Sequence, residues 1–180
     1  MKLSARLCAI ISAFSILFFP LHACSEISQN ADTAELIEAV KTALKEDIGR
    51  GITYFDRTRN PENGDIHIME EERFGYLYTG RIEPLPCRSR IKSYAVYLPS
   101  DIGGCEIHVI ECVNPSDTEE ITLFLQKRIK RLKSSEILSI APENSENCFK
   151  DAEVFTKGRF AFLLATPDNG AAKKAISRFL

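Results

Sequence analysis

The sequence predicts an α+β domain in which a four-stranded, mostly antiparallel sheet is built from two β-β-α units and packed with helices. Two observations predict this fold. Residues 91–180 contain two pairs of strand-like segments, and each pair is followed by apolar residues that recur at helical spacing. Turn residues separate the strands within each pair, as is typical of antiparallel hairpins. Helices packed on such a sheet bury the apolar surfaces of both.

The first unit begins with a strand at 91–98, because consecutive apolar residues in its second half can face both sides of a buried sheet. A loop at 99–104 leads to a return strand at 106–113, which completes the first hairpin. The sheet is therefore expected to start with an antiparallel pair.

A helix is predicted to follow this hairpin and to run to Lys133. Ser116 and Glu119 have the spacing of a capping box at its start. A shorter helix is predicted at 145–150. The buried side of the longer helix is predicted from its apolar residues at helical spacing: Ile121, Leu125, Ile129 and Leu132.

The second unit is predicted as a hairpin of strands at 152–156 and 159–165, with Lys157-Gly158 as its turn. A final helix follows. Pro167 is expected at its first helical position, where proline is favoured, and Phe179 at its end.

Residues 32–90 are predicted to supply an N-terminal helix and an irregular segment that pack on the C-terminal domain. Asp32 and Glu35 have capping-box spacing, so a helix is expected at 33–48, with Gly49 as its left-handed stop.

The stretch between this helix and residue 91 has few periodic signals. A turn is predicted at 60–64, where Asn, Pro and Gly occur together. A short helix is predicted at 70–78, with Gly80 as its stop. No strand is predicted in this part of the chain.

The first 23 residues have the layout of a secretory signal peptide. Lys2 and Arg6 precede an apolar stretch at 7–21, which is shorter than the roughly 20 residues that span a bilayer. The leader ends in Leu-His-Ala-Cys, which resembles the lipobox of bacterial lipoproteins. We therefore expect a lipid on Cys24, followed by a polar tether at 24–31.

Two alternatives to lipidation remain open, namely simple secretion and an uncleaved anchor. Ordinary signal peptidase prefers small residues at positions −1 and −3. Cleavage after Ala23 would place Leu21 at −3, which fits that enzyme poorly. Lipidation would hold the domain at the outer face of the cytoplasmic membrane.

The charge balance argues against nucleic acid as a partner. The leader contains two basic and no acidic residues, so the remaining chain carries 21 Lys and Arg against 25 Asp and Glu. A dedicated nucleic-acid binder would present a basic excess.

Four cysteines follow Cys24 and are candidates for disulfides outside the cytoplasm. Cys105 and Cys112 are predicted in one strand at odd spacing, so their side chains should point to opposite faces. Two pairings remain: Cys87 with Cys105 and Cys112 with Cys148, or Cys87 with Cys112 and Cys105 with Cys148. The alternative is that all four are buried free thiols. Their spacing does not fit a zinc site.

Several stretches resemble one protein family. They are Tyr94-Ala95-Val96, Cys105 to Val109 before a capped helix with Arg128, Ala141-Pro142, Ala152-Glu153-Val154 and Gly158-Arg159-Phe160. Together they resemble the C-terminal domain of Firmicutes lipoproteins grouped as domain-of-unknown-function family 4358. The resemblance covers roughly residues 35–180. It implies a lipobox leader, a helix, a variable middle and this domain, and it implies no activity, cofactor or catalytic residue.

Candidate catalytic and metal-binding residues are few. His67 lies near Asp65 and the acidic run 70–72, which together have the chemistry of a cation site but no recognised ligand spacing. The alternative is a solvated acidic turn at the start of a helix. We therefore expect no metal site and no cofactor.

A Cys–His hydrolase would need a nucleophile and a base brought together. Cys105 or Cys148 is a candidate nucleophile and His108 a candidate base, but nothing in the local sequence supports such a pair. His108 alternates with apolar residues and is expected to be a structural or surface strand residue. No catalytic residue is predicted.

On the helix that ends at Lys133, five basic residues lie on the side opposite the apolar ones: Lys127, Arg128, Lys130, Arg131 and Lys133. Three of them, Lys127, Lys130 and Arg131, form a candidate surface-binding basic face. The favoured interpretation is a solvated face that stabilises the helix C-terminus. The alternative is contact with anionic lipid or a wall polymer, where each basic residue contributes about 1 kcal/mol.

These observations predict a lipid-anchored extracytoplasmic protein that is not an enzyme and binds an envelope protein or polymer. The alternative is a hydrolase-like cell-envelope enzyme whose site is not recognisable in the sequence. The two differ in structure, because an enzyme should have titratable groups with shifted pKa values in a polar pocket.

Overall fold

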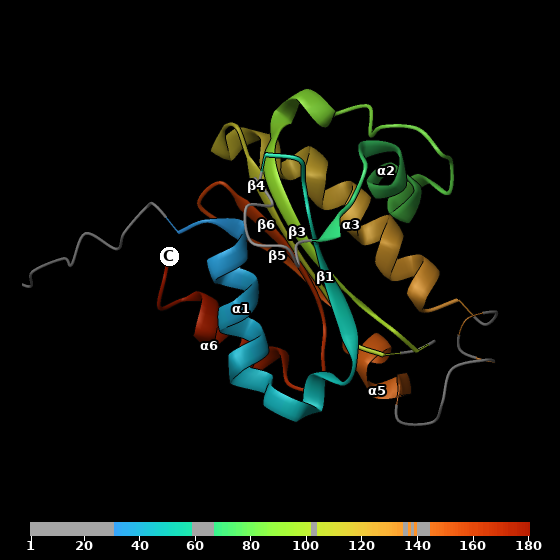
Figure 1. Ribbon diagram of the computed structural model, residues 1–180, viewed down its shortest axis with the longest axis vertical. Helices are drawn as coiled ribbons and strands as arrows, with labels where there is room; N and C mark the ends of the chain where they lie inside the picture. The colour runs from blue at the N-terminus through green and yellow to red at the C-terminus, as the bar shows by residue number, and fades with distance from the viewer. Residues whose placement is uncertain (1–30, 59–66, 102–103, 135–136, 138, 140–144) are drawn as a thin grey trace, which may run out of the picture.

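Six strands form one mixed sheet in the order β2-β1-β3-β4-β6-β5, with helices on both faces (Figure 1). The structure is a computed structural model that describes residues 31–58, 67–101, 104–134, 137, 139 and 145–180. β1 and β2 run parallel, and every other neighbouring pair is antiparallel. The strands are β1 (Gly51–Phe55), β2 (His67–Ile68), β3 (Ile91–Pro99), β4 (Glu106–Cys112), β5 (Glu153–Lys157) and β6 (Phe160–Ala165).

Helices cover the sheet on both sides. The described α-helices are α1 (Thr33–Leu44), α2 (Glu71–Thr79), α3 (Thr118–Leu132), α5 (Ser145–Lys150) and α6 (Asn169–Ile176). Three short 3-10 helices are also described: η1 (Lys45–Ile48) follows α1, η2 (Arg88–Arg90) precedes β3 and η3 (Pro115–Asp117) precedes α3. α1 and α6 pack against each other, and α2 packs against α3 (Figure 1).

The alternation of side chains along β4 assigns each helix pair to a face. His108 contacts Tyr78 of α2, and Glu106 contacts Arg128 of α3. Successive side chains of a strand point to opposite faces. The even-numbered residues of β4 therefore face α2 and α3, and the odd-numbered residues face α1.

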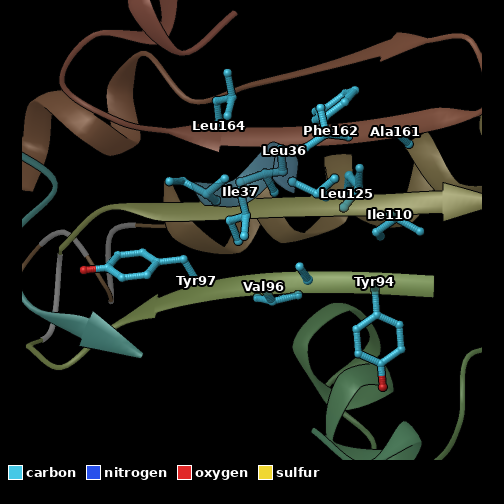
Figure 2. Packing of buried hydrophobic residues seen from close by; sticks show 14 of the residues in the cluster. Leu36, Ile37, Tyr94, Val96, Tyr97, Ile110, Leu125, Ala161, Phe162 and Leu164 are labelled. Carbon is cyan, nitrogen blue, oxygen red and sulfur yellow. The ribbon is translucent and has the colours of Figure 1, made fainter. Parts of the chain in front are cut away.

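The core extends through both faces of the sheet. Every residue of β4 and β6 is buried, because helices cover these central strands on each side. In Figure 2, Leu36 and Ile37 of α1 and Leu125 of α3 lie among the side chains of β3, β4 and β6. Each fully buried side chain of this size contributes about 1.5–3 kcal/mol to stability.

Local sequence determines several of the helix ends. The Asp32 carboxylate accepts hydrogen bonds from the backbone N–H groups of Ala34 and Glu35, both at 2.8 Å. The Glu35 carboxylate in turn accepts from the Asp32 N–H, so the predicted capping box is confirmed. α2 ends at Gly80, whose φ of 75° is the left-handed conformation that glycine adopts at low cost.

The α+β class is confirmed, but the prediction of four strands is wrong. β1 and β2 come from the segment 32–90, where no strand was expected, and they extend the sheet to six. β1 has five residues and β2 has two. Segments this short carry little periodic signal, and pairing with β3 determines the position of β1.

The predicted cap of the long helix is also wrong. α3 begins at Thr118, and the capping box before it is formed by Asn114 and Asp117 rather than by Ser116 and Glu119. The Asp117 carboxylate accepts from the Asn114 N–H at 2.9 Å.

The final helix starts later than predicted. Asp168 caps α6 by accepting from the Ala171 N–H at 2.8 Å, so Pro167 precedes the helix instead of opening it. An aspartate carboxylate satisfies a free N–H of the first turn, which proline at the first helical position does not do.

The segment predicted as a signal peptide, Cys24, most of the predicted tether and the turn predicted at 60–64 lie outside the described residues. Among the helices that are described, none is both long and apolar enough to cross a membrane.

Candidate functional site

Four polar side chains form a hydrogen-bonded chain between the sheet and helices α2 and α3. The Tyr78 hydroxyl lies 2.7 Å from His108 Nδ1, and His108 Nε2 lies 3.2 Å from Glu106 Oε2. Arg128 donates from Nε to Glu106 Oε2 at 3.0 Å and from Nη2 to Glu106 Oε1 at 2.5 Å. We call these four residues the buried network, since His108 is 0 % and Glu106 3 % exposed.

The proton positions in the buried network follow from its hydrogen bonds. Burial disfavours the imidazolium and lowers the pKa of His108, so the ring is neutral and carries one N–H. The Glu106 carboxylate can only accept, so this N–H lies on Nε2. Nδ1 then accepts from the Tyr78 hydroxyl, which stays protonated because burial raises the pKa of Tyr78 well above its ordinary value.

The other end of the buried network is an ion pair. Burial would raise the pKa of Glu106, but the hydrogen bond from His108 and the charge of Arg128 outweigh it and lower the pKa to about 2. Burial opposes the charge of Arg128, yet Glu106 raises the pKa of Arg128 overall. Both groups are therefore charged at neutral pH.

The buried network is suited to holding helices in place rather than to acid–base chemistry. A general acid or base must come within hydrogen-bond reach of a substrate proton. Both ring nitrogens of His108 already have partners inside the protein. The network joins α2, β4 and α3, so it fixes both helices on one face of the sheet.

An open cavity of about 550 Å³ lies beside α1, and none of the four network residues lines it. Its walls come from α1, the turn between η1 and β1, and strands β1, β2 and β3. The polar and aromatic residues of its lining are Glu38, Lys41, Arg50, Thr53, Phe55, His67, Tyr97 and Ser100.

Hydrogen bonds of Lys41 in α1 and Tyr97 in β3 hold one wall of the cavity in place. Lys41 Nζ lies 2.5 Å from Glu38 Oε1 and 3.2 Å from Thr53 Oγ1. The Tyr97 hydroxyl donates to the Gly49 carbonyl at 2.9 Å. A Cβ on Gly51 would lie 2.4 Å from Tyr97 Cζ, so glycine is what allows the tyrosine ring to lie against the backbone here.

Arg50 lines the cavity with a positive charge that an anionic ligand can contact. The charge of Lys41 is offset by Glu38. Arg50 is exposed and has no ion pair among the described residues. An arginine presents five N–H donors in a planar fork that fits a carboxylate or a phosphate.

The structure separates the residues of the candidate cation site. His67 lines the cavity, but Glu70 pairs with Arg57 and Glu71 pairs with Arg88. Within the described part of the chain, no three His, Cys, Asp or Glu side chains are grouped to hold a metal ion. Asp65 lies outside that part.

The candidate basic face on α3 is split between surface and interior. Lys127 and Lys130 are exposed. Arg131 donates to the backbone carbonyls of Tyr76 and Leu77, both at 3.2 Å, and so binds the C-terminal end of α2. Arg128, which the helical pattern placed on the same face, points instead into the buried network.

The four described cysteines are buried free thiols. The Cys105 and Cys148 sulfurs lie 3.4 Å apart. Neither ring nitrogen of His108 contacts a cysteine, because both are bonded to Tyr78 and Glu106. The hydrolase pair drawn from Cys105 or Cys148 with His108 is therefore not formed.

The buried network was not predicted from the sequence. His108 was expected to be a structural or surface strand residue, and the structure bears out the structural alternative. The one local indication of the buried network was that two polar residues, Glu106 and His108, lie two positions apart in β4 and so share one face of the strand. Their partners lie 22 and 30 residues away in sequence, beyond the reach of local patterns.

Comparisons of this chain with protein-family models, with curated proteins and with solved structures found no match. The function is therefore inferred from the geometry of the cavity and of the buried network.

Proposed function

We propose that this protein is an extracytoplasmic binding module, held at the outer face of the cytoplasmic membrane by a lipid on Cys24. Its cavity beside α1 takes a ligand that carries a carboxylate or phosphate group. The observation that carries this proposal is the separation of the cavity from the buried network. In an enzyme, groups with strongly shifted pKa values line the cleft that takes the substrate. Here Glu106 and His108 are buried between the sheet and helices α2 and α3, and neither of them lines the cavity.

The choice of an anionic ligand follows from the charges in the cavity. Arg50 is the lining cation whose charge no described carboxylate offsets, and hydrogen bonds to charged groups are about twice as strong as neutral ones. The hydroxyls of Thr53 and Ser100 supply further polar contacts. The volume of about 550 Å³ is within the range of small-molecule sites.

The anchor is supported by sequence alone. The short apolar leader and the fit of Leu21 to a lipobox both favour a lipid on Cys24. A tethered domain would meet its ligand at the membrane surface, as part of a larger envelope protein or polymer.

The anchor is tested by the intact mass of the protein extracted from membranes of an expressing bacterium. We expect an N-terminus at Cys24 with a diacylglyceryl thioether, and we expect a Cys24→Ala variant to leave the detergent phase. An unmodified Cys24, or an N-terminus elsewhere, would contradict lipidation.

The ligand site is tested by titrating inorganic phosphate into the ¹⁵N-labelled full chain and recording amide NMR spectra. We expect saturable shifts at Gly49, Arg50 and Gly51. Arg50→Gln should weaken phosphate binding roughly tenfold, because a hydrogen bond between charged groups contributes about 1.5 kcal/mol.

The matched control is Arg73→Gln, since Arg73 is an exposed arginine on α2 and does not line the cavity. This variant should bind phosphate as the wild type does. Sodium chloride at the same ionic strength should not reproduce the shifts. Equal weakening by the two substitutions, or shifts spread over the whole chain, would contradict a site in the cavity.

A further inference from the structure

Cys105 and Cys148 form a closely placed pair of thiols. Their sulfur atoms lie 3.4 Å apart, although the residues are 43 positions apart in sequence. Cys105 immediately precedes β4, and Cys148 lies in α5. Cys105 Sγ also lies 3.7 Å from the Asp47 carbonyl of η1. Three separate elements thus meet at these two sulfur atoms.

We propose that Cys105 and Cys148 are a disulfide site, and that their bond fastens α5 to the start of β4. A disulfide bond is about 2.05 Å long, so the sulfurs need to approach by a further 1.4 Å or so. This inference does not depend on the ligand of the cavity. Cys105 with Cys148 is one of the pairs that the sequence left open.

The burial of both residues also supports the proposal. The hydrogen bond between the two thiols raises the pKa of Cys105 and lowers the pKa of Cys148. Their exposed fractions are 3 % and 5 %. A bond between them would therefore be shielded from reductants once the protein is folded.

The same shielding places bond formation during folding, before α5 docks. The oxidant is a disulfide RSSR, either oxidised glutathione or the disulfide of a thiol oxidoreductase. One cysteine thiolate attacks a sulfur of RSSR, which forms a mixed disulfide and releases RS⁻. The second cysteine thiolate attacks the protein sulfur of that mixed disulfide and releases the other RS⁻. Two protein thiols are oxidised, RSSR is reduced, and the two thiol protons leave on two RSH molecules.

Cys87 and Cys112 provide an internal comparison. Burial raises the pKa of Cys87 to about 11 and that of Cys112 to about 12. In the described part of the chain, the hydrogen bond between two thiols is formed by Cys105 and Cys148. Substituting Cys87 therefore tests whether any buried thiol gives the same effect.

The experiment is refolding of the full chain in a buffer of reduced and oxidised glutathione, followed by alkylation of free thiols and peptide mapping. We expect a cross-linked peptide pair that contains Cys105 and Cys148. The oxidised protein should melt roughly 10 °C above the reduced protein, because the cross-link restricts the unfolded chain over a long loop.

Cys148→Ser should abolish this difference in melting temperature, and Cys87→Ser should retain it. Cys105 and Cys148 that stay alkylatable in oxidised glutathione, or that are recovered in other pairings, would overturn the proposal. The peptide map of the wild type gives this answer even if a serine variant fails to fold.

Discussion

Replacing Arg128 by methionine is expected to lower the free energy of unfolding by about 3–5 kcal/mol at neutral pH. In the wild type, Arg128 offsets the charge of buried Glu106, whose pKa is lowered to about 2 by its contacts with His108 and Arg128. Without the guanidinium, the described contacts leave this carboxylate one hydrogen bond, from His108. An uncompensated buried charge is among the largest single-residue penalties in a folded protein.

The measurement is urea unfolding followed by circular dichroism, and Arg159→Met is the matched control. Arg159 also pairs with a buried carboxylate, that of Glu111, at 2.6 Å. Glu111 keeps Lys92 at 3.0 Å and the Ser93 hydroxyl at 2.8 Å when Arg159 is removed. The control should therefore cost about 1–2 kcal/mol.

A double variant identifies the cause of the loss. Adding Glu106→Gln to Arg128→Met removes the buried charge and leaves an amide oxygen that can accept from His108. We expect it to recover at least about 1 kcal/mol of the loss. Equal losses for Arg128→Met and Arg159→Met, with no recovery in the double variant, would show that lost packing rather than charge determines the effect.

The parts of the fold that the sequence predicted are those determined by local interactions. The second hairpin has a glycine with φ of 58° at the predicted turn, and α1 has its capping box three residues apart. In both cases the residues that determine the structure are neighbours in the chain. Their positions could therefore be read from spacing alone.

The parts that the sequence did not predict depend on distant segments. β1 is a five-residue strand, and its place in the sheet comes from pairing with residues of β3 that lie 40 to 48 positions later in the chain. Arg128 followed the polar pattern of α3 and was assigned to a solvated face. The side chain of Arg128 points inward because it offsets the charge of buried Glu106. The two residues come together only when α3 packs on β4, so residue spacing does not show the pair.

The candidate site, like the fold, was predictable from the sequence only in part. His67 was considered as a cation ligand beside acidic residues, although no metal site was predicted. It lies in a cavity whose walls come from five elements. Arg50 was not singled out, because a lone arginine before a short strand carries no motif. A cavity formed by tertiary packing could not be derived from residue spacing.

Phe74 links α2 to the sheet next to the buried network. The side chain is fully buried, and its ring stacks on that of Tyr94 in β3, with centroids 3.8 Å apart and planes at 13°. It also meets the ring of Tyr78 edge to face at 5.0 Å. Tyr94 is held in turn by its hydroxyl, which donates to the Met69 carbonyl at 2.8 Å. The position of Tyr78 over His108 thus depends on this aromatic packing.

Replacing Phe74 by alanine is therefore expected to lower the free energy of unfolding by about 3–5 kcal/mol, because a cavity remains where the ring was. Tyr76→Ala is the control, since Tyr76 lies on the same helix but is 45 % exposed, and it should cost less than about 1 kcal/mol. Phe74→Leu should lie between them. Urea unfolding of the three variants measures these losses. If Phe74→Ala cost no more than Tyr76→Ala, α2 would not be held to the sheet by its buried face, and the buried network alone would have to fix it.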